Sequence, residues 1–202
     1  MIREDNRIGE PRVATPFSVA AYLASHVSLG QRVDISAFQA GIDLVCRAVE
    51  QGRQVITCGN GGSAYAASHF ITDWGKAVTA VAGSRFRGTS LCDNTGLLTA
   101  IANDLAYDQV FVGQLRAILE SRDLVIAISG SGNSPNVVNA VEFANAAGAE
   151  TLAVVGYDGG ALKQVARHAV WVPSFDMQLC EDTHLMFGHM VMKALGGARI
   201  LD

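Results

Sequence analysis

Two segments of this chain share one order: an apolar, β-branched run, then a loop of glycine, serine and asparagine, then a helix-like stretch. The segments are Val55–Ser63 and Val125–Ser134. A strand–loop–helix unit points backbone N–H groups beyond the strand, and the helix N-terminus adds partial positive charge. Glycine lets the backbone approach a ligand closely, and serine adds hydroxyl donors. The repeated unit therefore predicts an anion site, and its hydroxyl groups favour a phosphorylated small molecule.

Strand-like and helix-like runs alternate along the rest of the chain. The expected strands are 54–58, 89–92, 124–129, 151–155 and 169–172. Helices are expected near 63–76, 95–102, 108–120, 134–147, 160–166 and 181–195, with two more, 17–29 and 35–50, before the first strand. This alternation is typical of an α/β fold with a parallel sheet covered on both faces and ligands beyond the carboxyl ends of the strands. Asp34 is placed to cap the second helix, and Gly52 follows its end. We expect one domain over residues 1–202, in which 1–15 form a loose lead-in.

Composition limits the kinds of partner. The chain is 50% hydrophobic and only 17% charged, which predicts that some apolar surface lies between subunits. The net charge is −4 and no Lys/Arg cluster marks a nucleic-acid or anionic-membrane surface. No apolar run approaches the roughly 20 residues of a membrane span, and the polar start of the chain lacks a signal-peptide core. Four scattered cysteines without a CxxC pair favour reduced thiols in the cytoplasm.

The first loop also fits a relaxed dinucleotide-binding fingerprint, Gly59-x-Gly61-x-x-Ala64. That fingerprint requires an acidic residue about 20 positions later, which would bind the ribose. Residues 79–88 contain no Asp or Glu, so the dinucleotide interpretation is disfavoured. For either loop taken alone, a tight turn without a ligand remains an alternative.

Together, the motifs resemble the sugar isomerase (SIS) domain and, more narrowly, its phosphoheptose isomerase branch. They are Cys58–Ser63, Asp93, Thr99–Asp104, Ile128–Asn136, Asp158–Gly160 and Glu181-x-x-His184-x4-His189, in order over roughly residues 15–197. The resemblance implies a flavodoxin-like three-layer sandwich and a homotetramer with active sites at subunit interfaces. It also implies substrate and phosphate contacts at Asn60, Gly61, Ser63, Asp93, Ser129, Gly130, Ser131 and Ser134. The family usually has threonine at the position of Gly130, so here the N–H remains without the hydroxyl.

A carboxylate–histidine group is the second functional feature. His69 and Asp73 are four residues apart and share one helix face. The resemblance places a catalytic or metal-binding quartet on His69, Asp73, Glu181 and His189, where the family usually has His, Glu, Gln and His. Such donors suit a divalent metal, Zn²⁺ first.

Glu181 and His189 are eight residues apart, about 12 Å along a helix. Either Glu181 precedes the helix or the two residues serve different subunits' sites. A structural histidine at position 69 and a solvated acid at position 73 remain alternatives, and His184 is interpreted as structural. The family also usually has arginine where Leu179 stands, which indicates a divergent subgroup.

The resemblance, together with the carboxylate–histidine group, implies an aldose–ketose isomerase of a sugar phosphate. The expected reaction converts sedoheptulose 7-phosphate to D-glycero-D-manno-heptose 7-phosphate through an enediolate. Asp73 is the candidate base, and His189 is the candidate acid or metal ligand. The alternative is a non-catalytic SIS protein that senses a phosphosugar or acts as a DnaA-binding type of replication regulator. The presence of both His69 and His189 beside carboxylates favours catalysis.

Overall fold

A five-stranded parallel sheet forms the centre of the protein. The computed structural model describes residues 16–80 and 85–196, so the expected lead-in 1–15 lies outside the described residues. The strands are β1 (Val55–Gly59), β2 (Gly88–Ser90), β3 (Leu124–Ser129), β4 (Glu150–Val155) and β5 (His168–Trp171), in the order β2-β1-β3-β4-β5. Every ladder between them is parallel. This is the flavodoxin-like order, in which the chain reverses its direction of growth between β1 and β3. The expected fold class is confirmed.

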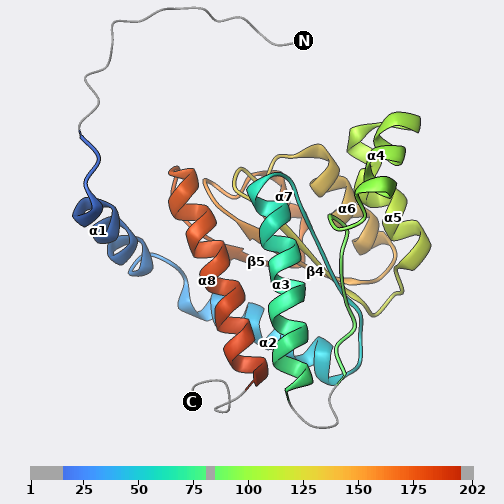
Figure 1. The fold of residues 1–202 in the computed structure, drawn as a ribbon, viewed down its shortest axis with the longest axis horizontal. Helices are drawn as coiled ribbons and strands as arrows, with labels where there is room; N and C mark the ends of the chain where they lie inside the picture. The colour runs from blue at the N-terminus through green and yellow to red at the C-terminus, as the bar shows by residue number, and fades with distance from the viewer. Residues whose placement is uncertain (1–15, 81–84, 197–202) are drawn as a thin grey trace, which may run out of the picture.

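Helices cover both faces of this sheet (Figure 1). One layer contains α2 (Ile35–Glu50), α3 (Gly62–Thr79) and α8 (Met177–Gly196). The other contains α5 (Val110–Ile118), α6 (Pro135–Ala146) and α7 (Gly160–Val165). In addition, α4 (Thr95–Asp104) packs beside α5, a 3₁₀ turn (Tyr107–Gln109) precedes α5, and α1 (Val19–Gly30) lies at the side of α8. No helix of the described ranges is long and apolar enough to cross a membrane.

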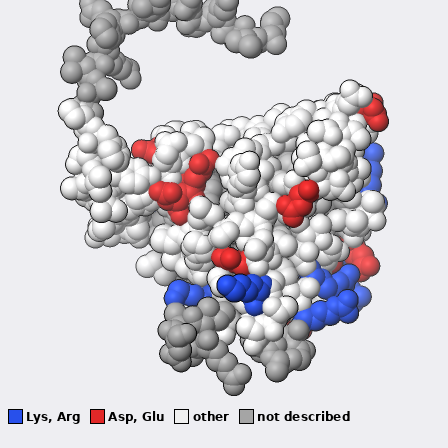
Figure 2. Space-filling model, viewed as in Figure 1, with Lys and Arg blue, Asp and Glu red and all other residues white. Residues whose placement is uncertain are grey.

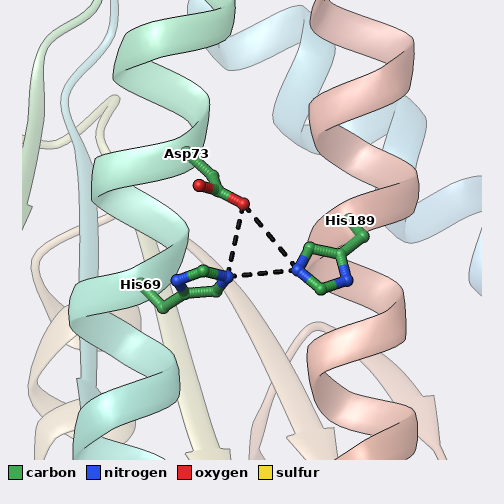
Figure 3. A group of neighbouring side chains, drawn as sticks. All are labelled: His69, Asp73 and His189. Atoms are coloured by element: carbon green, nitrogen blue, oxygen red, sulfur yellow. Dashed lines mark hydrogen bonds and ion pairs between the residues drawn. The ribbon is translucent and has the colours of Figure 1, made fainter. Parts of the chain in front are cut away.

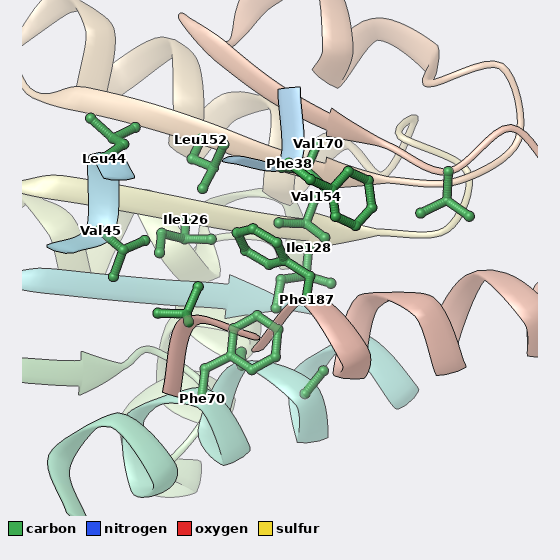
Figure 4. Packing of buried hydrophobic residues seen from close by; sticks show 14 of the residues in the cluster. Phe38, Leu44, Val45, Phe70, Ile126, Ile128, Leu152, Val154, Val170 and Phe187 are labelled. Carbon is green, nitrogen blue, oxygen red and sulfur yellow. The ribbon is translucent and has the colours of Figure 1, made fainter. Parts of the chain in front are cut away.

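The core has two parts because each strand buries side chains on both faces. Ile126 and Ile128 of β3 face the α2–α3–α8 layer, whereas Val125 and Ala127 face the other layer. Such strands appear in the sequence as continuous apolar runs. In the first layer, Phe187 packs against Phe38 and Phe70, with ring centroids 5.9 and 6.4 Å apart (Figure 4). This aromatic cluster joins α2, α3 and α8 to the sheet.

Periodicity and capping residues predicted the bounds of one helix correctly and those of two others only in part. The helix at 35–50 has the expected bounds, and the Asp34 side chain accepts a hydrogen bond from the N–H of Ala37. The last helix begins at Met177 rather than 181, because Asp176 accepts hydrogen bonds from the N–H groups of Gln178 and Leu179. The segment expected as one helix at 108–120 is instead the 3₁₀ turn followed by α5.

Candidate active site

The two Gly/Ser loops lie side by side at the carboxyl ends of β1 and β3, which are paired neighbours. In the first loop, Gly61 occupies the N-cap position of α3, and the Ser63 side chain is buried in the first turn. In the second, Ser129 ends β3, and its hydroxyl accepts a hydrogen bond from the N–H of Gly132. Ser134 occupies the N-cap position of α6, but its side chain makes no capping hydrogen bond. A hydroxyl at a helix N-terminus that does not serve its own helix is available to an anion.

The Asp158–Gly160 motif and the first turn of α7 that follows it hold the second loop in place. The N–H of Leu162 donates to the Gly132 carbonyl at 2.9 Å, and the N–H of Ala161 donates to Asn133 Oδ1 at 3.0 Å. A Cβ at Gly132, whose φ is +68°, would come within 2.0 Å of the Gly159 carbonyl oxygen. Only glycine allows this approach. The motif and the start of α7 together fix the shape of the loop that is expected to bind phosphate.

A pair of asparagines bridges the two loops. Asn60 and Asn136 exchange side-chain hydrogen bonds of 2.8 and 2.9 Å, and the Tyr107 hydroxyl donates to Asn60 Oδ1 at 2.8 Å. Next to them, Ser134 and Asp108 help to line a cleft of about 450 Å³. Sequence reasoning gave no role to Asn136 or Tyr107. Their contacts with Asn60 span 76 and 47 residues, and no local pattern indicates pairings of that range.

Asp93 lies at the carboxyl end of β2, where its carboxylate accepts a hydrogen bond from the Ser68 hydroxyl of α3. It lines a different cleft, together with Asn94, Leu97 and Gln114. The structure thus connects Asp93 to α3 rather than to the two Gly/Ser loops. Its contact with a substrate stays a prediction.

His69, Asp73 and His189 meet where α3 and α8 pack together, and their side chains point toward one another (Figure 3). Asp73 Oδ2 lies 3.3 Å from His69 Nε2 and 3.8 Å from His189 Nε2, and the two Nε2 atoms are 3.1 Å apart. Zinc bonds of 2.0–2.2 Å in a tetrahedron would separate the donor atoms by about 3.4 Å. The three donors therefore fit a divalent zinc-like ion, and the partly exposed side chains leave the position accessible.

Gly188 explains why α8 can bring His189 to α3. A Cβ at position 188 would lie 2.1 Å from Phe70 Cε1, so a larger residue would push the helices apart. The indole N–H of Trp74 donates to the Gly188 carbonyl oxygen at 2.8 Å, which fixes the same contact. Gly188 was not singled out in the sequence, although it directly precedes the histidine that it positions.

Glu181 is not part of this group within one chain. It lies inside α8 with its carboxylate against Gly62, so that a Cβ at Gly62 would be 2.4 Å from Glu181 Oε1. The idea that Glu181 precedes the helix is wrong, because α8 begins at Met177. Eight residues of one helix separate Glu181 from His189 by about 12 Å, which prevents both from binding a single ion. The structure therefore brings three of the four expected residues together.

His184 is buried in α8, with 1% of its surface exposed and no hydrogen-bond partner for either ring nitrogen among the described residues. Burial lowers the pKa of His184 to about 4, because charging the ring without water is unfavourable. The imidazole is thus neutral near pH 7. This agrees with a structural role, as the sequence indicated.

Comparison with known proteins adds a separate line of support. The SIS domain family matches residues 21–156. A phosphoheptose isomerase from Aliarcobacter butzleri is 38% identical over 148 residues, which cover 73% of this chain and 77% of that protein. Another, from Trichlorobacter lovleyi, is 34% identical over 183 residues, with 86% and 89% covered. The solved structure of phosphoheptose isomerase GmhA from Neisseria gonorrhoeae has a TM-score of 0.80 at 28% identity, covering 88% of this chain and 96% of that chain. Sequence and fold are thus shared over most of the length.

Proposed function

Because the chain belongs to the SIS domain family and to its phosphoheptose isomerase branch, we propose that it interconverts sedoheptulose 7-phosphate and D-glycero-D-manno-heptose 7-phosphate. The observation that carries this proposal is the convergence of Asp73 with His69 and His189. An aldose–ketose isomerisation needs a base and an acid in reach of adjacent carbons. The alternative of a non-catalytic regulator is not favoured, since the relatives at 33–40% identity are phosphoheptose isomerases.

The chemistry divides between the two helices. Asp73 takes the proton from the carbon next to the carbonyl and returns it to the neighbouring carbon. The enediolate is the intermediate between the two sugar phosphates. His189 exchanges a proton with the substrate oxygens as the carbonyl moves from one carbon to the other. The 3.8 Å between Asp73 Oδ2 and His189 Nε2 allows both groups to address the same pair of carbons.

We propose that His69, Asp73 and His189 also hold a divalent metal, Zn²⁺ first. Their donor atoms lie within 4.8 Å of one another, and imidazole nitrogen with carboxylate oxygen is a donor set that zinc accepts. When bound, the ion supplies Lewis-acid stabilisation of developing negative charge. Asp73 has two carboxylate oxygens, so binding through one leaves the other to hold a proton. With the ion bound through Nε2, His189 would serve as a ligand instead of as the acid, and the ion would then stabilise the charge on the substrate oxygens.

We propose that the phosphate binds at the two Gly/Ser loops, on the hydroxyls of Ser63, Ser129, Ser131 and Ser134, the N–H of Gly130 and the N–H groups at the starts of α3 and α6. On the face shown in Figure 2, most Lys and Arg side chains lie toward the bottom of the view, whereas the N-terminal end of α3 lies at the top in Figure 1. This distribution fits a phosphate site built from backbone and hydroxyl donors rather than from a basic surface.

We propose a cytoplasmic homotetramer with active sites between subunits. Asp73 lies eleven residues after Gly62, roughly 16 Å along α3, so the loops and the catalytic group of one chain are well separated. A second copy could bring its loops, or its Glu181, to this group. On α1, the exposed apolar residues Val19, Leu23 and Val27 recur every four residues and offer a surface for such contact. The four free cysteines support a reducing compartment.

Turnover of sedoheptulose 7-phosphate, followed by NMR with and without a chelator, tests the proposal. Wild type should convert the substrate, and Asp73→Asn should reduce kcat by about 10²-fold or more, because the amide cannot accept the proton. Glu142→Gln, a neutralised acid on α6 in the opposite helix layer, is the matched control and should retain activity. Binding of the sugar phosphate without any conversion by wild type would reject the isomerase and support the regulator.

A further inference from the structure

Tyr157 has an unusual backbone. Its φ of +47° makes it the only non-glycine residue with positive φ in the part of the chain that the structure describes. This left-handed conformation is unfavourable for a bulky side chain, whereas Gly or Asn would adopt it readily. Its N–H donates to the Ser174 carbonyl at 2.9 Å, and its carbonyl accepts from the Trp171 indole at 3.0 Å. Any residue could make these two backbone bonds. The tyrosine side chain is therefore present against the preference of its own backbone.

Phe175 is a second unusual aromatic residue in contact with the first. Its ring stacks on that of Tyr157, with centroids 5.4 Å apart and planes inclined by 25°. Tyr157 packs partly against the core, but Phe175 is 76% exposed. A large ring that gains so little burial from folding contributes little to stability. Backbone strain and aromatic exposure at one place point to a binding role.

The pair lies beside the second Gly/Ser loop. The N–H of Gly156 donates to the Gly130 carbonyl at 3.1 Å, which places Tyr157 next to the loop. From the start of α8, Met177 Sδ lies only 2.5 Å from where a Cβ of Gly130 would be. Met177 thus fills the space that a larger residue at 130 would need. Tyr157, Phe175 and Met177 give the loop an apolar rim at the carboxyl ends of β4 and β5.

We propose that Tyr157 and Phe175 form an aromatic subsite that binds the C–H face of the sugar chain next to the phosphate. This inference rests on the proposed function, since it needs a sugar phosphate held by the neighbouring loop. Sugars present apolar C–H faces between their hydroxyls, and stacked rings offer a flat apolar surface with few rotatable bonds to fix. The subsite selects the carbon chain, while the loops hold the phosphate.

Two variants remove the subsite by different routes. Phe175→Ser deletes the exposed ring, and Tyr157→Asn deletes the other ring while suiting the left-handed backbone. Each should raise KM for sedoheptulose 7-phosphate about three- to tenfold, with kcat and the inhibition constant of inorganic phosphate unchanged. Tyr157→Phe retains the ring and should behave as wild type. Ile35→Ser removes an equally exposed apolar side chain from the start of α2 and is the matched control.

Thermal unfolding and light scattering separate binding from folding and assembly. Tyr157→Asn should unfold at a temperature close to that of wild type, because relief of strain offsets the lost packing. An unchanged KM in both ring-deleting variants would overturn the subsite. So would a changed molar mass, which would identify the patch as a contact between copies. If wild type shows no turnover, the proposed function fails. Calorimetry then tests the subsite separately by measuring the affinity of wild type and variants for sedoheptulose 7-phosphate. Equal affinities would overturn the subsite as well.

Discussion

Replacement of His184 by leucine should reduce the acid sensitivity of this protein. The ring is buried, and neither nitrogen has a partner among the described residues. Burial lowers the pKa of His184 in the folded state from 6.5 to about 4. Between these values the unfolded chain binds a proton at this position and the folded chain does not. Stability is therefore retained above pH 6.5 and lost as the pH falls toward 4.

The size of the effect follows from the same shift. One pKa unit corresponds to about 1.4 kcal/mol. As the pH falls from above 6.5 to below 4, protonation of this residue alone should therefore lower the free energy of unfolding by about 3 kcal/mol. Leucine fills a similar volume without polar atoms. Because the wild-type ring leaves buried nitrogens unpaired, His184→Leu should be as stable as wild type near pH 7, or more so.

Urea denaturation from about pH 7.5 to about pH 4.5 measures this, with wild type and His184→Leu at one protein concentration. The difference between their unfolding free energies isolates His184 from the carboxylates, which titrate in both proteins. It should change by about 2–3 kcal/mol over this range in favour of leucine at low pH. Parallel pH curves for the two proteins would refute the reasoning.

Three further outcomes are expected. Gly188→Ala should overpack the contact with Phe70 and lower the free energy of unfolding by about 1–2 kcal/mol, as measured by thermal unfolding. It should also weaken zinc binding by displacing His189, and an unchanged zinc affinity in a metal titration would contradict the role of this contact. Ser131→Ala combined with Ser134→Ala should weaken phosphosugar binding at least tenfold in calorimetry with little change in the melting temperature, and an unchanged affinity would reject the phosphate site. Light scattering at micromolar concentration should give four times the mass of the 21.3 kDa chain, whereas a stable monomer would exclude sites shared between subunits.

The sequence by itself determined the elements that depend on local interactions. Apolar runs, loop glycines and the Asp34 cap placed β3 and α2 with the observed bounds, because periodicity and capping act within a few residues. Alternation of strands and helices fixed the class of sheet, since parallel strands require covered crossovers. The two Gly/Ser loops were recognisable for the same reason, as each joins a strand directly to a helix.

Only the tertiary structure decided which distant side chains meet. His69 and His189 are 120 residues apart, and their contact depends on Gly188 and Trp74 at the crossing of two helices. The same helix geometry keeps Glu181 out of that group. The stacking of Tyr157 on Phe175 likewise required two strand ends to lie side by side. A residue pattern specifies which face of a helix is apolar, but the packing of side chains between elements sets their spacing and therefore which functional groups come into contact.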